Sequence, residues 1–138
     1  GRSRYAAAMF AKQDVRGAAR HLKRGGLLWY APDQDPSRGD SVYVPFFGQP
    51  AHSLTSTHQL ARMSGAAVLL FSHRRREDGG FDLSIGPAFE DFPSADATAD
   101  TARVIAGIEA MARAAPAQYL WIHRRFKRRP DGGDVYAD

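Results

Sequence analysis

The amino-acid sequence predicts an α/β fold in which short buried strands are flanked by helices. Three observations lead to this prediction. Apolar residues recur at helical spacing in several segments, short apolar runs follow the ends of these segments, and glycine or proline separates one from the next. The chain has 138 residues, the usual size of a single domain. We expect that domain over residues 1–130, followed by a disordered tail over residues 131–138.

Three segments carry the signals of helices. Residues 14–24 begin at Asp14, whose short carboxylate suits an N-cap, and a pair of glycines follows their end. Residues 55–63 place apolar side chains on one face, and residues 98–115 carry the longest apolar stripe of the chain. An alanine-rich segment over residues 5–10 also favours a helix.

Strands are predicted from short apolar runs. Residues 27–31 and 66–71 have the composition of buried strands, whereas residues 41–47 contain a proline and suit a sheet edge or a strand end. The sequence Glu77-Asp78-Gly79-Gly80 is typical of a tight turn. We therefore expect the apolar run before this turn to pair with residues 81–85 as a hairpin.

Composition and charge exclude several classes of protein. The sequence has no cysteine, which excludes a disulfide scaffold and a thiolate zinc site. The longest wholly apolar run, residues 66–71, is far shorter than the ~18 residues that cross a bilayer. The net charge of +4 is concentrated in residues 124–129, of which five are basic. Such a segment favours an anionic partner, which can be a phosphate, a nucleic acid or a membrane surface.

A short acidic sequence, Asp33-Gln34-Asp35, directly follows the predicted strand over residues 27–31. In α/β sheets, ligands bind at the carboxyl ends of strands. Two carboxylates beside an amide can bind a sugar hydroxyl, an amine or a cation, or hold a basic residue in place. An ordinary aspartate-rich turn has the same composition, so both interpretations stay open at this point.

Two other polar groups contain catalytic residue types without a catalytic arrangement. His73 and Asp78 match the His-x4-Asp spacing of a base and its orienting carboxylate. They lie at the predicted hairpin tip, where solvent surrounds them, so we interpret them as a solvated turn. The polar residues 52–58 form no nucleophile elbow and no zinc motif. We interpret them as residues that open a helix.

Residues 119–129 mix aromatic and cationic side chains. Guanidinium groups match phosphate oxygens, so this segment suits phosphate binding, and it equally suits RNA or a membrane surface. A solvated basic tail is the plainer interpretation, although Trp121 and Phe126 indicate that part of it packs. A small nucleic-acid-binding module that uses residues 119–129 is therefore the alternative to an enzyme. Against it, the sequence has no recognisable nucleic-acid-binding signature.

Five stretches of the sequence resemble the late (secondary) lipid A acyltransferases, the lauroyl and myristoyl transferases of Gram-negative lipopolysaccharide synthesis. The stretches are residues 22–26, 29–35, 44–48, 60–66 and 116–130. The second is Trp-Tyr-Ala-Pro-Asp-Gln-Asp, and the last is Pro-Ala-Gln-Tyr-Leu-Trp-Ile-His-Arg-Arg-Phe-Lys-Arg-Arg-Pro. The resemblance runs through nearly the whole chain, and the last stretch is the most specific.

This resemblance implies transfer of a fatty acyl chain from acyl carrier protein to a hydroxyl of a lipid A precursor. The expected location is the cytoplasmic face of the bacterial inner membrane, with the membrane surface as a partner and with no cofactor, metal or nucleic acid. The family's catalytic His-x4-Asp/Glu motif and its membrane anchor precede the matched region. We therefore expect a partial acyltransferase-type sheet truncated at the N-terminus, with no catalytic residue in this chain and no activity of the chain alone.

The resemblance also implies roles for residues at the matched positions. The substrate-binding residues would be Asp33, Gln34, Asp35, Arg2, Thr55 and Arg62. The first three would border the acceptor-sugar pocket or the active-site pocket. The residues that would contact lipid phosphates or the acidic carrier protein are Arg124, Arg125 and Lys127.

Overall fold

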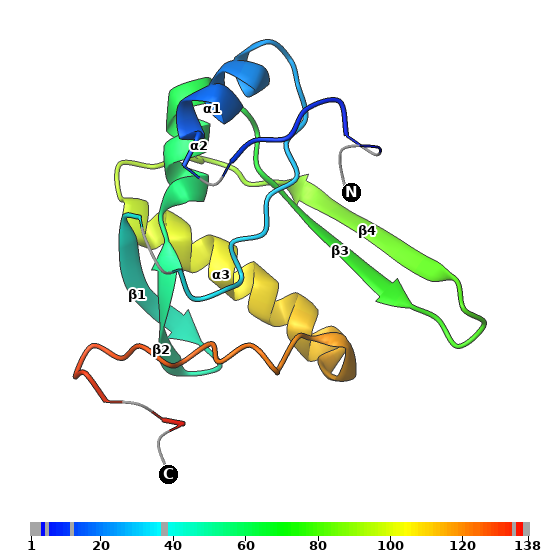
Figure 1. Ribbon diagram of the computed structural model, residues 1–138, viewed down its shortest axis with the longest axis vertical. Helices are drawn as coiled ribbons and strands as arrows, with labels where there is room; N and C mark the ends of the chain where they lie inside the picture. Colours follow the sequence, from blue (N-terminus) through cyan, green and yellow to red (C-terminus); the bar gives the residue numbers. More distant parts are fainter. Residues whose placement is uncertain (1–3, 5, 12, 37–38, 134, 137–138) are drawn as a thin grey trace.

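The computed structural model describes residues 4, 6–11, 13–36, 39–133 and 135–136. Three α-helices, a short 3-10 helix and two antiparallel hairpins form a mixed α/β structure (Figure 1). In chain order the elements are α1 (Val15–Lys23), β1 (Ser41–Phe46), β2 (Gln49–Leu54), α2 (Ser56–Ser64), β3 (Leu69–Arg75), β4 (Phe81–Ala88), α3 (Ala97–Ala114) and η2 (Pro116–Gln118). The expected α/β class is confirmed, but the strands are arranged differently from the expectation.

The three main predicted helices are confirmed, and local contacts explain where they begin and end. At the start of α1, the Asp14 carboxylate accepts a hydrogen bond from the Gly17 amide at 2.8 Å, as an N-cap does. The Asp96 carboxylate caps α3 in the same way. Helix α2 ends at Gly65, whose φ of 72° lies in the left-handed region that favours glycine.

The β1–β2 hairpin contains a strand, β2, that the sequence did not predict. Phe47 and Gly48 form its turn, with φ values of 50° and 74°. A positive φ is uncommon for phenylalanine, so contacts with α3 must hold it. The Phe47 amide donates a hydrogen bond to Oε2 of Glu109 at 2.6 Å, and the Arg113 guanidinium lies 4.6 Å from the centre of the Phe47 ring.

The main hydrophobic core lies between one face of the β1–β2 hairpin and α3. Successive side chains of a strand point to opposite faces, so this hairpin buries one face and leaves the other partly open. The buried apolar residues of this core are Val44, Phe46, Ala51 and Ile105. A second cluster joins α1 to α2 through Ala18, Ala19 and Leu60. The site described below lies on the outer face of the same hairpin.

Two of the predicted elements are wrong. Residues 27–31 form no strand, and Leu27 and Trp29 are 89% and 68% exposed. A strand needs a hydrogen-bonded neighbour, and within the described part of the chain no strand pairs with this run. The alanine-rich residues 6–10 are not helical, and Tyr5 lies outside the described residues.

The β3–β4 hairpin predicted from its turn is confirmed, and it projects from the rest of the molecule (Figure 1). Strand β3 is not buried as expected, because Leu69 and Phe71 are 45% and 40% exposed. Leu70 approaches α3 at Gly107, where a Cβ atom would collide with its side chain. Among the described residues the strands form two separate two-stranded sheets, which corrects the expected single sheet of buried strands.

Candidate functional site

A buried aspartate joins two segments that are far apart in the sequence. We call residues 32–36 the acidic loop and residues 123–129 the basic segment, which crosses the β1–β2 hairpin (Figure 1). The Asp35 amide donates a hydrogen bond to Nε2 of His123 at 2.8 Å. Its carboxylate lies 2.9 Å from Nδ1 of His52, 3.4 Å from Nζ of Lys127 and 3.7 Å from Nη1 of Arg128.

The charge of Asp35 is compensated rather than left unpaired in the interior. Its side chain is 0% exposed, whereas Lys127 and Arg128 are 40% and 39% exposed. A buried carboxylate is tolerated only when it is paired or hydrogen-bonded, so these cations hold the two segments together. Burial and the charges of Lys127 and Arg125 lower the pKa of His123. The neutral ring can therefore accept the Asp35 amide hydrogen bond.

Arg125 is buried, and its hydrogen bonds to β2 anchor the basic segment to the hairpin. It is 3% exposed, and it donates hydrogen bonds to the His52 carbonyl at 2.5 Å and to Oγ of Ser53 at 2.6 Å. Its guanidinium also lies 5.6 Å from the centre of the Phe46 ring. Burial lowers its pKa. Arg125 therefore uses its charge and donors within the chain, while Arg124 and Lys127 are exposed.

The other predicted substrate-binding residues of the acidic loop lie toward its surface. Asp33 is half-buried and Gln34 is exposed. The negative charge of Asp33 acts to raise the pKa of His123, so the acidic loop also interacts electrostatically with the basic segment through a residue other than Asp35. Arg2 lies outside the described residues.

Thr55 lies at the start of α2 and Arg62 lies within α2, rather than beside Asp35. Thr55 is the N-cap residue of α2, and both its amide and its hydroxyl donate to the Asp40 carbonyl, at 3.0 Å and 3.1 Å. Gln59 donates to the Asp40 carboxylate at 2.9 Å. Thr55 therefore anchors the chain just after the acidic loop. Arg62 is exposed on α2.

His52 and Ser41 are two site residues for which the sequence predicts no site role. Oγ of Ser41 is 2.6 Å from Nε2 of His52, and the other ring nitrogen of His52 faces Asp35. His52 lies in β2, a strand that the sequence does not predict, because the polar residues 52–58 have the composition of residues that open a helix. The alternation of buried and more exposed side chains before and after the Phe47-Gly48 turn is the signal that would have identified β2 and, with it, His52.

His73 and Asp78 are not brought together by the contacts described. The His73 ring lies beside Phe71 and Phe81, at centroid distances of 6.2 Å and 6.1 Å. The Asp78 carboxylate binds Arg76 at 2.9 Å, and a backbone hydrogen bond from the turn together with Arg76 lowers its pKa.

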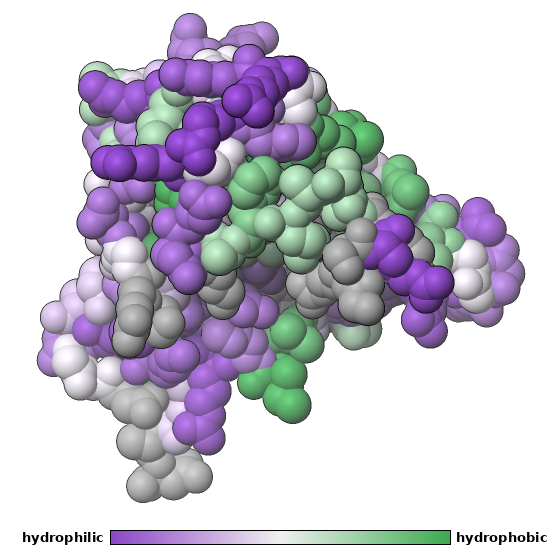
Figure 2. Space-filling model, turned by 45° about the horizontal axis from the view of Figure 1, so that its top comes forward, coloured by the Kyte–Doolittle hydropathy of each residue, from purple (hydrophilic) through white to green (hydrophobic). Residues whose placement is uncertain are grey.

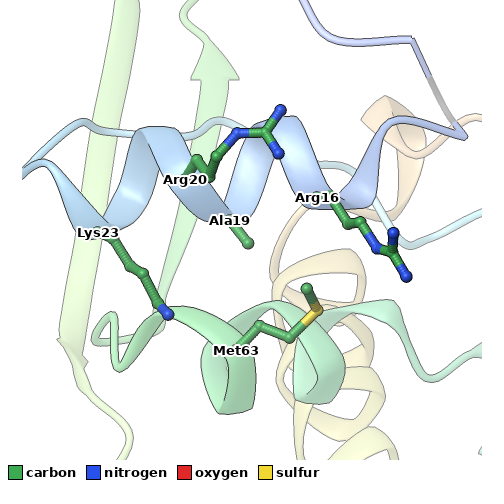
Figure 3. Close-up of a pocket in the computed structure, with 5 residues that line it drawn as sticks. All are labelled: Arg16, Ala19, Arg20, Lys23 and Met63. Atoms are coloured by element: carbon green, nitrogen blue, oxygen red, sulfur yellow. The ribbon is translucent and has the colours of Figure 1, made fainter.

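A second basic surface lies between α1 and α2. Its hollow has a volume of about 190 Å³ and is lined by Arg16, Ala19, Arg20, Lys23 and Met63 (Figure 3). None of the three cations has an ion pair among the described residues. Figure 2 shows hydrophilic side chains gathered over this end of the molecule, with an apolar surface beside them.

Two kinds of feature are missing from the described part of the chain. No group of three or more histidine, cysteine, aspartate or glutamate side chains there is arranged to hold a metal ion. Nor does any described helix have the length and apolar character that crossing a membrane requires.

Comparisons with known proteins give a consistent result. The family model for bacterial lipid A biosynthesis acyltransferases matches residues 1–128. The lipid A biosynthesis lauroyltransferase and palmitoleoyltransferase of Escherichia coli (strain K12) are each 42% identical over 134 residues, which is 96% of this chain and 44% of each relative. A lipid A biosynthesis acyltransferase of Haemophilus influenzae is 36% identical over 95% of this chain and 43% of the relative. The chain thus spans less than half the length of these relatives.

Proposed function

The chain belongs to the bacterial lipid A biosynthesis acyltransferase family, and from this premise we propose that the whole protein transfers a fatty acyl chain from acyl carrier protein to a hydroxyl of a lipid A precursor. In this reaction the acceptor hydroxyl attacks a thioester carbonyl with the help of a general base. We place that base in the family's His-x4-Asp/Glu motif, ahead of the matched region. The alternative of a nucleic-acid-binding module has no support from the comparisons.

The observation that carries this proposal for the present chain is the Asp35 junction between the acidic loop and the basic segment. It brings the Lys127 ammonium to 3.4 Å from the carboxylate of Asp35, which directly follows Asp33 and Gln34 in the same loop. Carboxylate and amide oxygens suit sugar hydroxyls, and exposed cations suit phosphate oxygens. We therefore assign the acceptor to the acidic loop and its anionic groups to Lys127 and Arg124.

We also place the protein at a membrane surface, on the cytoplasmic face of the inner membrane. Directly before the basic segment, Leu120, Trp121 and Ile122 are 52%, 51% and 88% exposed. Apolar and aromatic side chains beside exposed cations suit an interface in which rings and aliphatic groups meet lipid and charges meet headgroups. This combination supports a peripheral contact at the C-terminal end of the chain.

Acyl transfer from acyl carrier protein to a lipid A precursor in detergent tests the proposal. The whole protein would be assayed beside Asp33→Asn and Lys127→Gln. Because each substitution removes one charge-assisted contact, we expect turnover to fall about 10-fold or more. Arg74→Gln is the matched control, since Arg74 is a 59% exposed cation at the distant hairpin tip and should leave turnover unchanged.

Two results would count against the proposal. If the whole protein transfers no acyl chain to any lipid acceptor, the proposed function is wrong. If transfer occurs but Asp33→Asn and Lys127→Gln retain full turnover, the function stands and the assignment of the acidic loop and basic segment to the acceptor is wrong.

A further inference from the structure

A serine, a histidine and an aspartate lie in a hydrogen-bonded row on the outer face of the β1–β2 hairpin. Oγ of Ser41 is 2.6 Å from Nε2 of His52, and Nδ1 of His52 is 2.9 Å from Oδ1 of Asp35. A ring whose Nδ1–H donates to a carboxylate has its Nε2 available to accept a proton. Nucleophile, base and orienting carboxylate stand in this order in enzymes that transfer acyl groups through a serine.

The register of the hairpin places the first two members of this row side by side. Ser41 lies opposite Leu54, and Tyr43 lies opposite His52. Residues two apart in a strand point to the same face, so Ser41 and His52 are diagonal neighbours across the two strands. The opposite face of both strands is buried against α3, which fixes the backbone that carries them.

Burial decreases along the row from the carboxylate to the hydroxyl. The Asp35 side chain is 0% exposed and that of His52 is 15% exposed, while Ser41 is half-buried. The carboxylate is therefore shielded from water while the hydroxyl can meet a substrate. The His58–Asp100 pair is different, because both side chains are buried and no hydrogen bond to the other His58 ring nitrogen is found among the described residues.

Two cations of the basic segment lie beside the His52–Asp35 end of the same row. Nη1 of Arg128 is 3.5 Å from Nδ1 of His52, and the Lys127 ammonium is 3.4 Å from the Asp35 carboxylate. Both cations are partly exposed, and both contacts lie at the carboxylate and Nδ1 end of the row. Such a setting favours an acyl donor with an anionic leaving group or an anionic carrier.

We propose that Ser41 is a nucleophile that takes an acyl group from a thioester or another activated ester, with His52 as its base and Asp35 as the positioning residue. Oγ of Ser41 bonds to the carbonyl carbon while the carbon–sulfur bond breaks. The serine proton passes to Nε2 of His52 and from there to the leaving thiolate. Water or a hydroxyl acceptor then cleaves the serine ester, and its proton returns along the same route. This chemistry goes beyond the proposed function and does not depend on a lipid acceptor.

A fluorophosphonate probe tests the proposal directly, because it bonds to an activated serine and releases fluoride. The whole protein would be labelled, digested with trypsin and mapped by fragmentation of the peptide over residues 39–62. We expect labelling at Ser41, none there in Ser41→Ala, and a rate at least ~100-fold lower in His52→Ala. External imidazole should restore labelling of His52→Ala, which a purely structural role of the ring would not allow.

Asp35→Asn tests the positioning role separately. Its labelling rate per folded molecule, with the folded fraction taken from circular dichroism, should fall, and imidazole should not restore it because the His52 ring still occupies the site. Ser84→Ala removes an exposed serine on β4 and should label at the wild-type rate. Absence of labelling at Ser41 in the folded protein would overturn the proposal, and so would equal labelling of His52→Ala. Neither result bears on lipid A acyl transfer, so the two proposals can fail independently.

Discussion

Replacing Asp35 by asparagine tests how the basic segment is held against the β1–β2 hairpin. Asparagine keeps the size of the side chain and an oxygen for the His52 ring. It removes the negative charge that faces Lys127 at 3.4 Å and Arg128 at 3.7 Å. Since the Asp35 side chain is 0% exposed, water cannot replace these contacts at the carboxylate itself. The substitution should therefore lower the free energy of unfolding.

The magnitude follows from how the partners are exposed. Removing one member of a fully buried ion pair costs about 3–5 kcal/mol. Lys127 and Arg128 are 40% and 39% exposed and regain part of their hydration, which reduces the loss to about 2 kcal/mol. For a chain of this length, a loss of 1 kcal/mol lowers the melting temperature by roughly 3 °C, so we expect a drop of about 6 °C.

Urea denaturation followed by circular dichroism and thermal melting at neutral pH measures this loss. Asp33→Asn is the control, because Asp33 lies two residues earlier in the same loop, is half-buried and has no ion pair among the described residues. It should cost less than about 0.5 kcal/mol. Equal losses for the two variants, or a loss below about 0.5 kcal/mol for Asp35→Asn, would refute the reasoning.

Three further outcomes are expected. Because the pKa of His123 is lowered, its neutral form stabilises the fold. This contribution is complete above about pH 6.5 and is lost as the pH falls below that value. Urea titrations of wild type and His123→Gln at several pH values would show the loss. Burial raises the pKa of Asp100, but hydrogen bonds from His58 and Ser94 outweigh burial and lower this pKa overall. Protonation of Asp100 should therefore contribute to acid unfolding below about pH 4, and Asp100→Asn should lack this contribution. Phe46 is 1% exposed in the main core, and Phe46→Ala should cost about 3–5 kcal/mol in urea denaturation.

The elements predicted correctly are those whose signals are local in the sequence. The start of α1 depends on Asp14 three residues before the Gly17 amide, and the end of α2 depends on Gly65 in the next position. The turn between β3 and β4 likewise lies within five consecutive residues, 76–80. Such contacts can be inferred from a short window because the interacting atoms are only a few bonds apart.

The elements predicted wrongly depend on contacts between distant residues. The turn of the β1–β2 hairpin has Phe47 at a positive φ, which is held by Glu109 and Arg113 of α3. No local rule favours phenylalanine there, so β2 was missed. Residues 27–31 were predicted as a strand from apolar composition alone. Composition does not supply the hydrogen-bonded neighbour that a strand requires.

Charge alone likewise could not predict which basic residues of the site are available to a ligand, because contacts between distant residues decide this. Five basic residues between 124 and 129 suggested a segment free to bind an anion. In the structure, Arg125 is buried against β2, Arg128 faces Asp35, and Arg129 reaches Asp131 at 3.7 Å. Most of this charge therefore neutralises or anchors groups of the same chain. Arg124 and Lys127 are the exposed cations of this segment that we expect to bind an external anion, and Lys127 is shared with the carboxylate that supports His52. An anion bound at Lys127 would compete for the cation that faces Asp35, so substrate binding and the state of the His52 row should be coupled.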